Sequence, residues 1–216
     1  MQTIKGKRLE LLHDTHPENL TELLLSLRGV ERGFLEREIF HDPLLLPDIQ
    51  RAIERIAFAR QNKERVMIFG DYDVDGISST AALFLFLRDD LSMDVSYRLP
   101  HRVHDGYGIK SYHMDEIAKT GTKLVVTVDC GTKDAIPIEH AYSLGMDVIV
   151  TDHHSCPQIL PQCVAVVNPQ RSDSLYPFRG LSGSGVVWKC IHAFCDFFFP
   201  EKTSLILQKY VDIISL

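Results

Sequence analysis

Three aspartates at alternate positions, Asp71, Asp73 and Asp75, follow a short apolar run at 66–69 and precede a glycine. In an extended backbone, alternate side chains point to the same side, so these carboxylates are predicted to crowd one spot. Carboxylates that lie so close together in a dry site stay ionised only when a positive charge lies among them, and a divalent metal ion is the simplest such charge. The segment therefore predicts a metal site, and the chemistry that it favours is metal-dependent hydrolysis of phosphate esters.

Two other interpretations of this segment compete with the metal site. The spacing Asp-x-Asp-x-Asp-Gly also begins the calcium-binding loop of an EF-hand, but that loop needs a Glu at its twelfth position, where this chain has Ala82. An EF-hand also needs a preceding helix, whereas 66–69 predicts a strand. An exposed acidic turn, which most clusters of Asp and Gly form, stays open for this segment alone.

The composition is that of an ordinary globular protein. The chain has 216 residues, of which 45% are hydrophobic, and a formal net charge of −6, so any contact with nucleic acid has to come from a local patch or a bound metal. We expect no membrane association, because no signal-peptide pattern and no apolar run of sufficient length are present. The five cysteines are odd in number and form no Cys-x-x-Cys pair, which argues against a disulfide framework or structural zinc and predicts the reducing cytoplasm.

The hydrophobic pattern changes along the chain. The segment 1–63 is predicted to be helical, with helices at 20–27, ending near Gly29, and at 49–60. From residue 64 onward, strands and helices alternate, which predicts an α/β fold with a parallel sheet flanked by helices. The expected strands are 66–69, 94–98, 124–128, 147–151 and 164–167, and the expected helices are 77–88, 110–120, 134–144 and a final one at 205–216.

Acidic and imidazole side chains follow three of the predicted strands. Asp71 follows the first strand, Asp129 follows 124–128, and Asp152, His153 and His154 follow 147–151. Because functional groups gather beyond the carboxyl ends of parallel strands, we expect these residues to meet at one edge of the sheet. This convergence favours a metal site over an exposed acidic turn.

Three further segments carry candidate functional groups. The loop 98–108 offers Arg98, Arg102 and His104 for contact with phosphate or substrate, although a solvated loop is an open alternative. The Gly/Ser turn at 180–188 leads into a helix and could present backbone N–H groups to an anion, or its glycines could allow close packing. Asp212 lies in an otherwise apolar stretch, where a charged residue is usually paired or bound.

The type of ligand narrows the chemistry. Carboxylates with one or two imidazoles and no thiolate suit Mn²⁺ or Mg²⁺ better than structural zinc, and several shared carboxylates suit two ions about 3.5–4 Å apart. Such a pair lowers the pKa of a bridging water, while a nearby imidazole can bind a phosphate oxygen or protonate the leaving group. Cys130, beside Asp129, is expected to be a buried packing residue rather than a nucleophile.

Three motifs together resemble the DHH phosphoesterases: Gly-Asp-Tyr-Asp-Val-Asp-Gly at 70–76, Val-Asp-Cys-Gly at 128–131 and Thr-Asp-His-His at 151–154. The residues of these motifs are similar to those of the family's bacterial exonucleases specific for single-stranded DNA. Further matches lie at 100–102, 105–108, 167–169, 176–177 and 181–186. The resemblance covers roughly residues 40–216. It implies 5′→3′ hydrolysis of phosphodiester bonds in single-stranded DNA, in DNA repair and recombination, with two Mn²⁺ or Mg²⁺ ions.

The same resemblance implies roles for particular residues. The metal ligands would be Asp73, Asp75, Asp129, His153 and, from the segment 210–216, Asp212, with Asp129 bridging the two ions. His154 would serve phosphate or leaving-group chemistry, and Asp71 would be a second catalytic group close to the metals. Arg102 resembles a family arginine near the DNA phosphate, and His104, from the composition of the loop 98–108 alone, is the second expected substrate contact.

The chain also departs from the family pattern. It ends at Leu216, before the second, glycine-rich domain that normally closes over the substrate, and it has Asp105 where the family usually has Glu. We therefore expect 64–216 to be the DHH phosphoesterase domain of a truncated chain, a fragment or half of a split protein. Its expected partners are single-stranded DNA and a missing C-terminal half or a single-strand-binding protein.

Two other functions stay open. A DHH phosphoesterase acting on oligonucleotides or small phosphorylated substrates usually begins its first motif with His and Asn-Pro, where this chain has Gly70, Asp71 and Tyr72. An inactive scaffold fragment would be signalled by lost metal ligands, and none of the ligands expected from the motifs is lost. The absent second domain keeps the scaffold hypothesis open.

Overall fold

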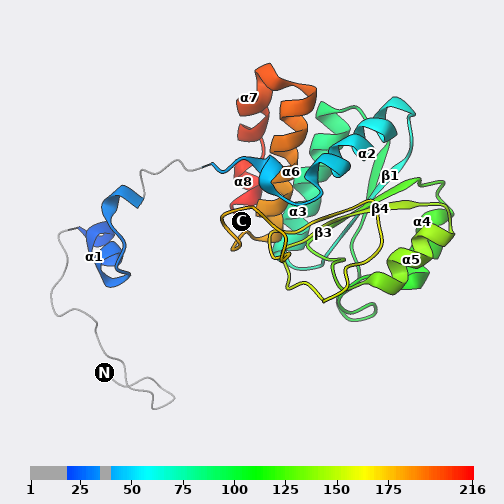
Figure 1. Ribbon diagram of the computed structural model, residues 1–216, viewed down its shortest axis with the longest axis horizontal. Helices are drawn as coiled ribbons and strands as arrows, with labels where there is room; N and C mark the ends of the chain where they lie inside the picture. The colour runs from blue at the N-terminus through cyan, green and yellow to red at the C-terminus, as the bar shows by residue number, and fades with distance from the viewer. Residues whose placement is uncertain (1–18, 35–39) are drawn as a thin grey trace, which may run out of the picture. The chain divides into compact units, whose positions relative to one another are not determined.

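The computed structural model describes residues 19–34 and 40–216. The chain divides into two compact units, Met1–Phe40 and His41–Leu216, and each is described by itself (Figure 1). Residues 1–18 and 35–39, which belong to the predicted helical segment 1–63, lie outside the described residues.

The first unit contains the helix predicted at 20–27. Helix α1 (Leu20–Leu27) begins after Asn19, whose side chain accepts hydrogen bonds from the backbone N–H groups of Thr21 and Glu22. It ends next to Gly29, which has φ of 63° and therefore a left-handed conformation that glycine adopts without a steric cost. The helix and its stop signal are thus confirmed.

The second unit is built on one parallel sheet of five strands in the order β2-β1-β3-β4-β5. All four strand pairs are parallel, which confirms the predicted α/β fold. Every residue of the two central strands β1 and β3 is buried, as expected for apolar runs covered by helices on both faces. The strands are β1 (Val66–Gly70), β2 (Val95–Arg98), β3 (Leu124–Val128), β4 (Asp147–Thr151) and β5 (Ala165–Val167).

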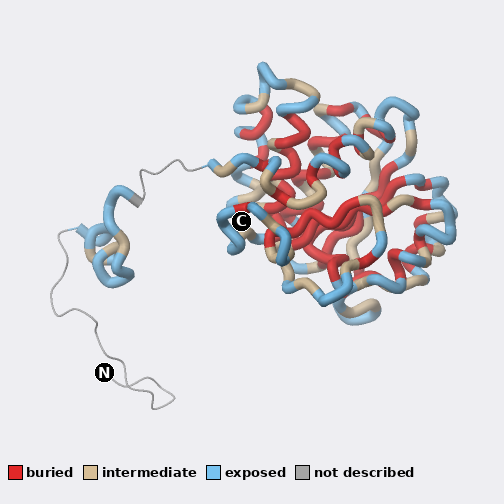
Figure 2. The backbone as a smooth tube through the Cα atoms, in the orientation of Figure 1, coloured by how far each residue is buried: buried red, intermediate tan, exposed pale blue. Residues whose placement is uncertain are grey.

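The sheet separates two apolar cores, because alternate strand residues point to opposite faces. Ile68 and Val126 face a core with α2 (Ile49–Gln61), α3 (Val74–Leu85) and α6 (Gly183–Phe198). Phe69 and Val125 face a second core with α4 (Ser111–Ala118) and α5 (Ala135–Ser143). Figure 1 shows these helices on the two sides of the sheet, and Figure 2 shows the buried residues running along the strands between them.

The final helix predicted at 205–216 is wrong as a single element. The chain forms a 3₁₀ turn at Pro200–Lys202, helix α7 (Thr203–Gln208) and helix α8 (Val211–Ile214). The break falls at Tyr210, whose buried ring packs edge-on against Phe86 and whose hydroxyl donates a hydrogen bond to Asp90. These contacts come from a distant part of the chain, so the local apolar pattern could not report them.

The predicted boundary between residues 63 and 64 separates a helical segment from the phosphoesterase domain. In the structure, α2 belongs to the second compact unit, because Ile49, Ile53 and Ile56 are buried in its larger core. The family boundary at residue 64 stays a prediction. Within the described ranges, no helix combines the length and apolar character that a membrane crossing requires.

Candidate metal centre

The first acidic motif lies where β1 ends and α3 begins. Asp73 caps the helix, because its carboxylate accepts a hydrogen bond from the backbone N–H of Gly76 at 3.0 Å. Helix α3 therefore starts at Val74 rather than at the predicted residue 77, and Asp75 lies in its first turn. The prediction that all three aspartates project alike from extended backbone is wrong, because the cap turns the chain into a helix before Asp75.

Two of these aspartates meet a third carboxylate from the end of β3. Single carboxylate oxygens of Asp71, Asp73 and Asp129 all lie within 4.8 Å of one another. Asp71 and Asp129 are 3% and 1% exposed, and the Oδ1 atom of each is buried without a well-directed hydrogen bond. Burial raises the pKa of Asp71, and it raises the pKa of Asp129 to about 6 against the opposing effect of His153. Buried oxygens without donors are suited to a cation.

The backbone holds Asp129 firmly in this position. Asp129 has φ of 60°, a left-handed conformation that is uncommon outside glycine, and its backbone N–H donates to the Thr151 carbonyl at 3.0 Å. The first turn of α6 then closes against it, because a Cβ on Gly183 would lie 2.5 Å from Asp129 Oδ1. A side chain at residue 183 has no room beside this carboxylate.

The predicted anion site in the Gly/Ser turn binds an anion from the protein itself. The backbone N–H groups of Gly183 and Ser184, at the start of α6, each donate to the carboxylate of Asp75 at 2.7 Å. Positive partial charge at a helix N-terminus favours such a carboxylate. The close-packing explanation also holds for Gly183, as its contact with Asp129 shows.

His153 completes a second group of ligand atoms around Asp129. Its Nδ1 lies 2.9 Å from the Leu181 carbonyl, which can only accept, so Nδ1 carries the proton. Its Nε2 faces two carboxylates, at 3.1 Å from Asp129 Oδ1 and 3.6 Å from Asp75 Oδ2. Without a metal, Nε2 shares a second proton with Asp129, which raises the pKa of His153. When Nε2 carries no proton, its lone pair can bind a metal ion instead. The hydrogen bond from Nδ1 to the Leu181 carbonyl is the kind of bond that usually orients a metal-binding histidine.

His154 is held by Asp152, a carboxylate whose pKa is lowered, in contrast to the raised pKa of Asp129. Asp152 is 1% exposed and accepts hydrogen bonds from the backbone N–H groups of Thr132, His153 and His154 and from His154 Nδ1 at 2.7 Å. Although burial alone would raise the pKa of Asp152, the bonds from His154 and Thr132 lower it to about 2. The bond to Asp152 in turn raises the pKa of His154. The imidazole is therefore fixed in orientation, and its Nε2 is left for the site.

A further group of possible ligand atoms links the two histidines. Asp129, His153 and His154 each offer one atom within 4.8 Å of the others, so Asp129 belongs to both groups of candidate ligands. A carboxylate shared by two groups is the arrangement that a bridging ligand of two ions requires. The sequence placed Asp71, Asp73, Asp129, His153 and His154 at one edge of the sheet, and the structure brings these five together.

Comparison with known proteins identifies the family. The profile of the "DHH family, N-terminal domain" matches residues 65–216, which is more than half of the chain. The chain belongs to the DHH family. The predicted membership is therefore confirmed, and the fold is that of this family's N-terminal domain.

Curated relatives of this DHH chain carry the name "single-stranded-DNA-specific exonuclease RecJ". The protein from Bacillus subtilis is 36% identical over 190 residues, which cover 83% of this chain and 24% of the relative. The protein from Escherichia coli is 35% identical over 178 residues, which cover 79% of this chain and 31% of the relative. The DHH chain thus spans about a quarter to a third of the length of these relatives.

Solved structures show the same likeness. The crystal structure of exonuclease RecJ bound to manganese is 28% identical, with a TM-score of 0.66, over 77% of this chain and 43% of that one. The structure of RecJ in complex with Mn²⁺ from Thermus thermophilus is 25% identical, with a TM-score of 0.60, over 76% of this chain and 24% of that one. The parallel sheet flanked by helices is therefore shared with RecJ.

Asp212 of the DHH chain lies outside both groups of candidate ligands. It is exposed on α8, and its carboxylate accepts a hydrogen bond from the backbone N–H of Ile213. Helix α8 approaches the start of α6, where the Ser184 hydroxyl lies 3.5 Å from the Ile214 carbonyl. The role of Asp212 as a metal ligand stays a prediction, as does that of Asp75, whose two oxygens already accept backbone hydrogen bonds.

The basic loop of the DHH chain contributes differently from residue to residue. Arg98 forms an ion pair with Glu116, and its role in binding phosphate stays a prediction. Arg102 lies over the Tyr72 ring at 5.5 Å, and His104 is exposed beside His101, with ring centroids 4.5 Å apart. Neither Arg102 nor His104 belongs to the two ligand groups, and their substrate contacts stay predictions.

Two functional neighbours were given no role by the sequence. Asp152 was recognised only as part of its motif, and Tyr107 was not considered, although its hydroxyl lies 3.4 Å from His154 Nδ1. Asp152 could have been found from its position directly after a strand end, between Thr151 and the two histidines. Cys130 is buried in the core with α4 and α5, as expected for a packing residue, and burial raises the pKa of its thiol well above the usual range.

Proposed function

We propose that this chain carries the catalytic centre of a metal-dependent phosphodiesterase that hydrolyses single-stranded DNA. The observation that carries the proposal is the buried Asp129 carboxylate, which is shared by two groups of ligand atoms and whose Oδ1 faces His153 Nε2 at 3.1 Å. The curated relatives are named single-stranded-DNA-specific exonucleases, which favours this substrate over other phosphate esters. Action from the 5′ end, in DNA repair and recombination, belongs to the same proposal.

The residues fit a pair of Mn²⁺ or Mg²⁺ ions. Asp71, Asp73 and Asp129 would hold one ion, and Asp129 with His153 would hold the other, with Asp75 and Asp212 as further predicted ligands. This donor set of carboxylates and imidazole lacks thiolate and suits these hard or intermediate ions. When bound, the ions activate water as the nucleophile and neutralise charge on the phosphoryl oxygens. The solved structures of RecJ relatives were described with manganese bound.

The protein groups around the ions orient the phosphate and move the proton. His154 is turned by Asp152 so that its Nε2 can donate to a phosphoryl oxygen or to the leaving oxygen. Its raised pKa keeps the imidazolium populated at a higher pH than usual, which favours the donor role. Asp71 adds a buried negative charge that strengthens cation binding at the shared edge. Arg102 is proposed to contact the DNA phosphate, and His104 to contact the substrate.

The location and partners complete the proposal. We place the protein in the cytoplasm, supported by its five cysteines, which are all free and therefore compatible with a reducing compartment. Single-stranded DNA is the proposed macromolecular substrate. A substrate-closing domain and a single-strand-binding protein as partners rest on the family resemblance alone.

The test compares substrates with and without Mn²⁺. Release of nucleotides from single-stranded DNA is measured beside duplex DNA, dinucleotides and pyrophosphate, for the wild-type chain and Asp129→Asn. We expect turnover of single-stranded DNA that needs Mn²⁺ and falls by about 10³-fold in the variant, because a preorganised charge at the reacting phosphate is lost. Preference for dinucleotides or pyrophosphate would replace this function with that of a small-substrate phosphoesterase. Mn²⁺ binding without turnover of any substrate would support a scaffold.

A further inference from the structure

An apolar groove lies beside the metal centre, between α3 and the edge strand β2. Its volume is about 330 Å³, and Ile77, Phe84, Tyr97 and Leu99 are among the side chains that line it. Strand β2 is at the edge of the sheet, so this groove opens to solvent along the side of the domain. It differs from the metal centre in having almost no charged lining.

The groove shares a wall with the metal-binding loop. A Cβ at Gly70, the residue directly before Asp71, would lie 1.9 Å from Thr80 Oγ1 and 3.0 Å from Leu99 Cδ2, and both of these side chains line the groove. Helix α3 starts at the metal centre and carries the groove away from it. From Ile77 to Phe84 the helix rises roughly 11 Å, at about 1.5 Å per residue.

The groove displays an aromatic ring that the core does not require. Tyr97 is 57% exposed and Ile77 is 47% exposed, so both retain apolar surface in contact with water. The Tyr97 ring is held in place edge-on by Phe84, with centroids 5.3 Å apart and planes at 75°. A fixed, exposed aromatic face beside apolar side chains is the surface on which nucleic-acid bases stack.

A cationic group, Arg102, follows the groove residue Leu99 in sequence and contacts the metal-binding loop. Arg102 is three residues beyond Leu99 and lies over the ring of Tyr72, which stands between Asp71 and Asp73 in sequence. Among the described residues, Arg102 forms no ion pair with a carboxylate. A chain with a formal net charge of −6 needs such a local cation to attract a phosphate backbone.

We propose that this groove is a base subsite, which binds one nucleobase of single-stranded DNA next to the phosphate held at the metal centre. The inference rests on the proposed function and names a part of its substrate. The base stacks on Tyr97, over the apolar floor formed by Ile77 and Phe84, and its backbone passes Arg102. The size argues against a docked protein, because a stable protein interface takes about 20–30 residues on each partner, whereas this groove is lined by seven.

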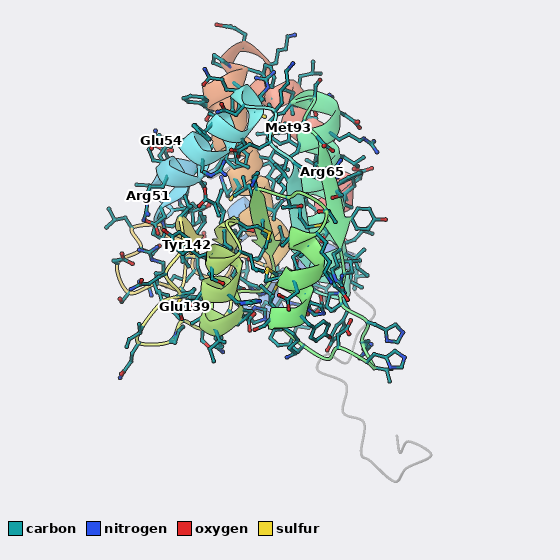
Figure 3. All side chains as sticks on the ribbon, turned by 90° about the vertical axis from the view of Figure 1, so that its right-hand side faces the viewer. Arg51, Glu54, Arg65, Met93, Glu139 and Tyr142 are labelled. Atoms are coloured by element: carbon teal, nitrogen blue, oxygen red, sulfur yellow. The ribbon has the colours of Figure 1, made fainter. Side chains whose placement is uncertain are left out.

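The test measures binding of fluorescein-labelled oligothymidylate by anisotropy in EDTA, where hydrolysis cannot occur. We expect Tyr97→Ala to weaken binding about 5- to 150-fold, the value of one base–aromatic stack. Tyr97→Phe keeps the aromatic face and should bind like the wild type. Tyr142→Ala removes another exposed tyrosine, on α5 at the far side of the sheet, and should also bind normally (Figure 3).

An abasic nucleotide, moved position by position along the oligothymidylate, identifies the base concerned. In the wild type, one position should lose as much affinity as Tyr97→Ala does, and in Tyr97→Ala that position should lose no more. Equal abasic losses in both proteins, or no position dependence in the wild type, would overturn the base subsite. If Tyr97→Ala does not fold, the wild-type scan still decides.

Turnover of a dinucleotide that lacks both bases with Mn²⁺ separates the two proposals, because this small diester needs the metal centre but has no base to place in the groove. Normal turnover in Tyr97→Ala with weakened oligonucleotide binding supports the subsite. Binding that depends on Tyr97, without turnover of any ester, would contradict the proposed function and leave the subsite standing.

Discussion

Asp129 and Asp152 occupy equivalent places and have opposite properties. Each directly follows the end of a central parallel strand, β3 or β4, and each is 1% exposed. Asp152 accepts hydrogen bonds from three backbone N–H groups and one imidazole, and its pKa falls to about 2. Among the described residues, the Asp129 carboxylate accepts no backbone hydrogen bond and faces only His153 Nε2, at 3.1 Å from Oδ1, and its pKa rises to about 6.

The difference shows how one sheet edge provides two kinds of buried carboxylate. Hydrogen bonds to the ionised form make Asp152 a permanent anion that orients His154 without external help. The lack of backbone donors leaves Asp129 dependent on the proton that it shares with His153, or on a cation, for its charge balance. A supporting residue and a ligand can therefore be told apart by counting donors, even when burial and strand position are the same.

The largest effect expected from the difference between Asp129 and Asp152 is the pH dependence of the free energy of unfolding in the absence of metal. Asp129, raised from 3.8 to about 6, contributes stability that is present below pH 3.8 and is lost as the pH rises through about 6. At 1.36 kcal/mol per pH unit, this loss is at most about 3 kcal/mol. In urea unfolding in EDTA, we expect the free energy of unfolding of the wild type to fall between pH 4 and about 6, and that of Asp129→Asn to stay flatter there.

Metal addition and the second carboxylate provide the controls for that experiment. Mn²⁺ should restore the stability of the wild type at pH 7 and leave Asp129→Asn unchanged, because only a ligand that binds the native state stabilises it. Asp152 acts in the other direction, since its lowered pKa gives stability that is present above pH 3.8 and is lost as the pH falls through about 2. Identical pH profiles for wild type and Asp129→Asn would remove the distinction between the two carboxylates.

The fold was largely predictable because its signals are local. Four of the five strands are short, mostly apolar runs that need no distant information, and all five were predicted within one or two residues. The errors lie where a distant contact decides. Tyr210 breaks the final helix by binding Asp90, about 120 residues earlier, and Asp73 starts α3 early by capping it. Capping could have been foreseen, since an aspartate before a helix is a common start signal.

The next effect in size concerns the support that Asp152 gives to His154. Asp152→Asn replaces an anion with an amide, so His154 loses the partner that raises its pKa. We expect kcat on single-stranded DNA to fall about 10- to 100-fold, as for other outer supports of a metal site, with Mn²⁺ affinity from calorimetry little changed. The pKa of His154, followed by NMR in EDTA, should fall in the variant.

Asp147, a carboxylate at the amino-terminal end of the same strand, controls for a general loss of stability in the sheet. Asp147 is the first residue of β4, and its carboxylate accepts a hydrogen bond from Arg55 Nε at 2.6 Å, at the end of the strand opposite to Asp152. Asp147→Asn should leave kcat and the pKa of His154 as in the wild type. A loss of Mn²⁺ binding in Asp152→Asn as large as that in Asp129→Asn would show that Asp152 is a ligand and not a support.

The location of the site could be predicted from the sequence, but the role of each residue in it could not. Strand position brought Asp129, His153 and His154 together in the prediction, because all carboxyl ends of a parallel sheet lie at one edge. The roles depend on which donors reach each carboxylate. Those donors come from Thr132 for Asp152 and from the start of α6 for Asp75, and no local pattern reports them.

The smallest effect tests how tightly α6 encloses Asp129. In Gly183→Ala the new methyl group would meet Asp129 Oδ1 at 2.5 Å and its Cβ at 2.7 Å, so either α6 or the carboxylate has to move. We expect a loss of about 1–2 kcal/mol in the free energy of unfolding and weaker Mn²⁺ binding by calorimetry. Gly185→Ala in the same turn is the matched control, because the nearest neighbours of its methyl group are side-chain atoms of Leu181 and Ser182, none closer than 3.3 Å. If both variants bind Mn²⁺ equally well, the position of Asp129 does not depend on its contact with α6, and the donors around each carboxylate alone explain the contrast with Asp152.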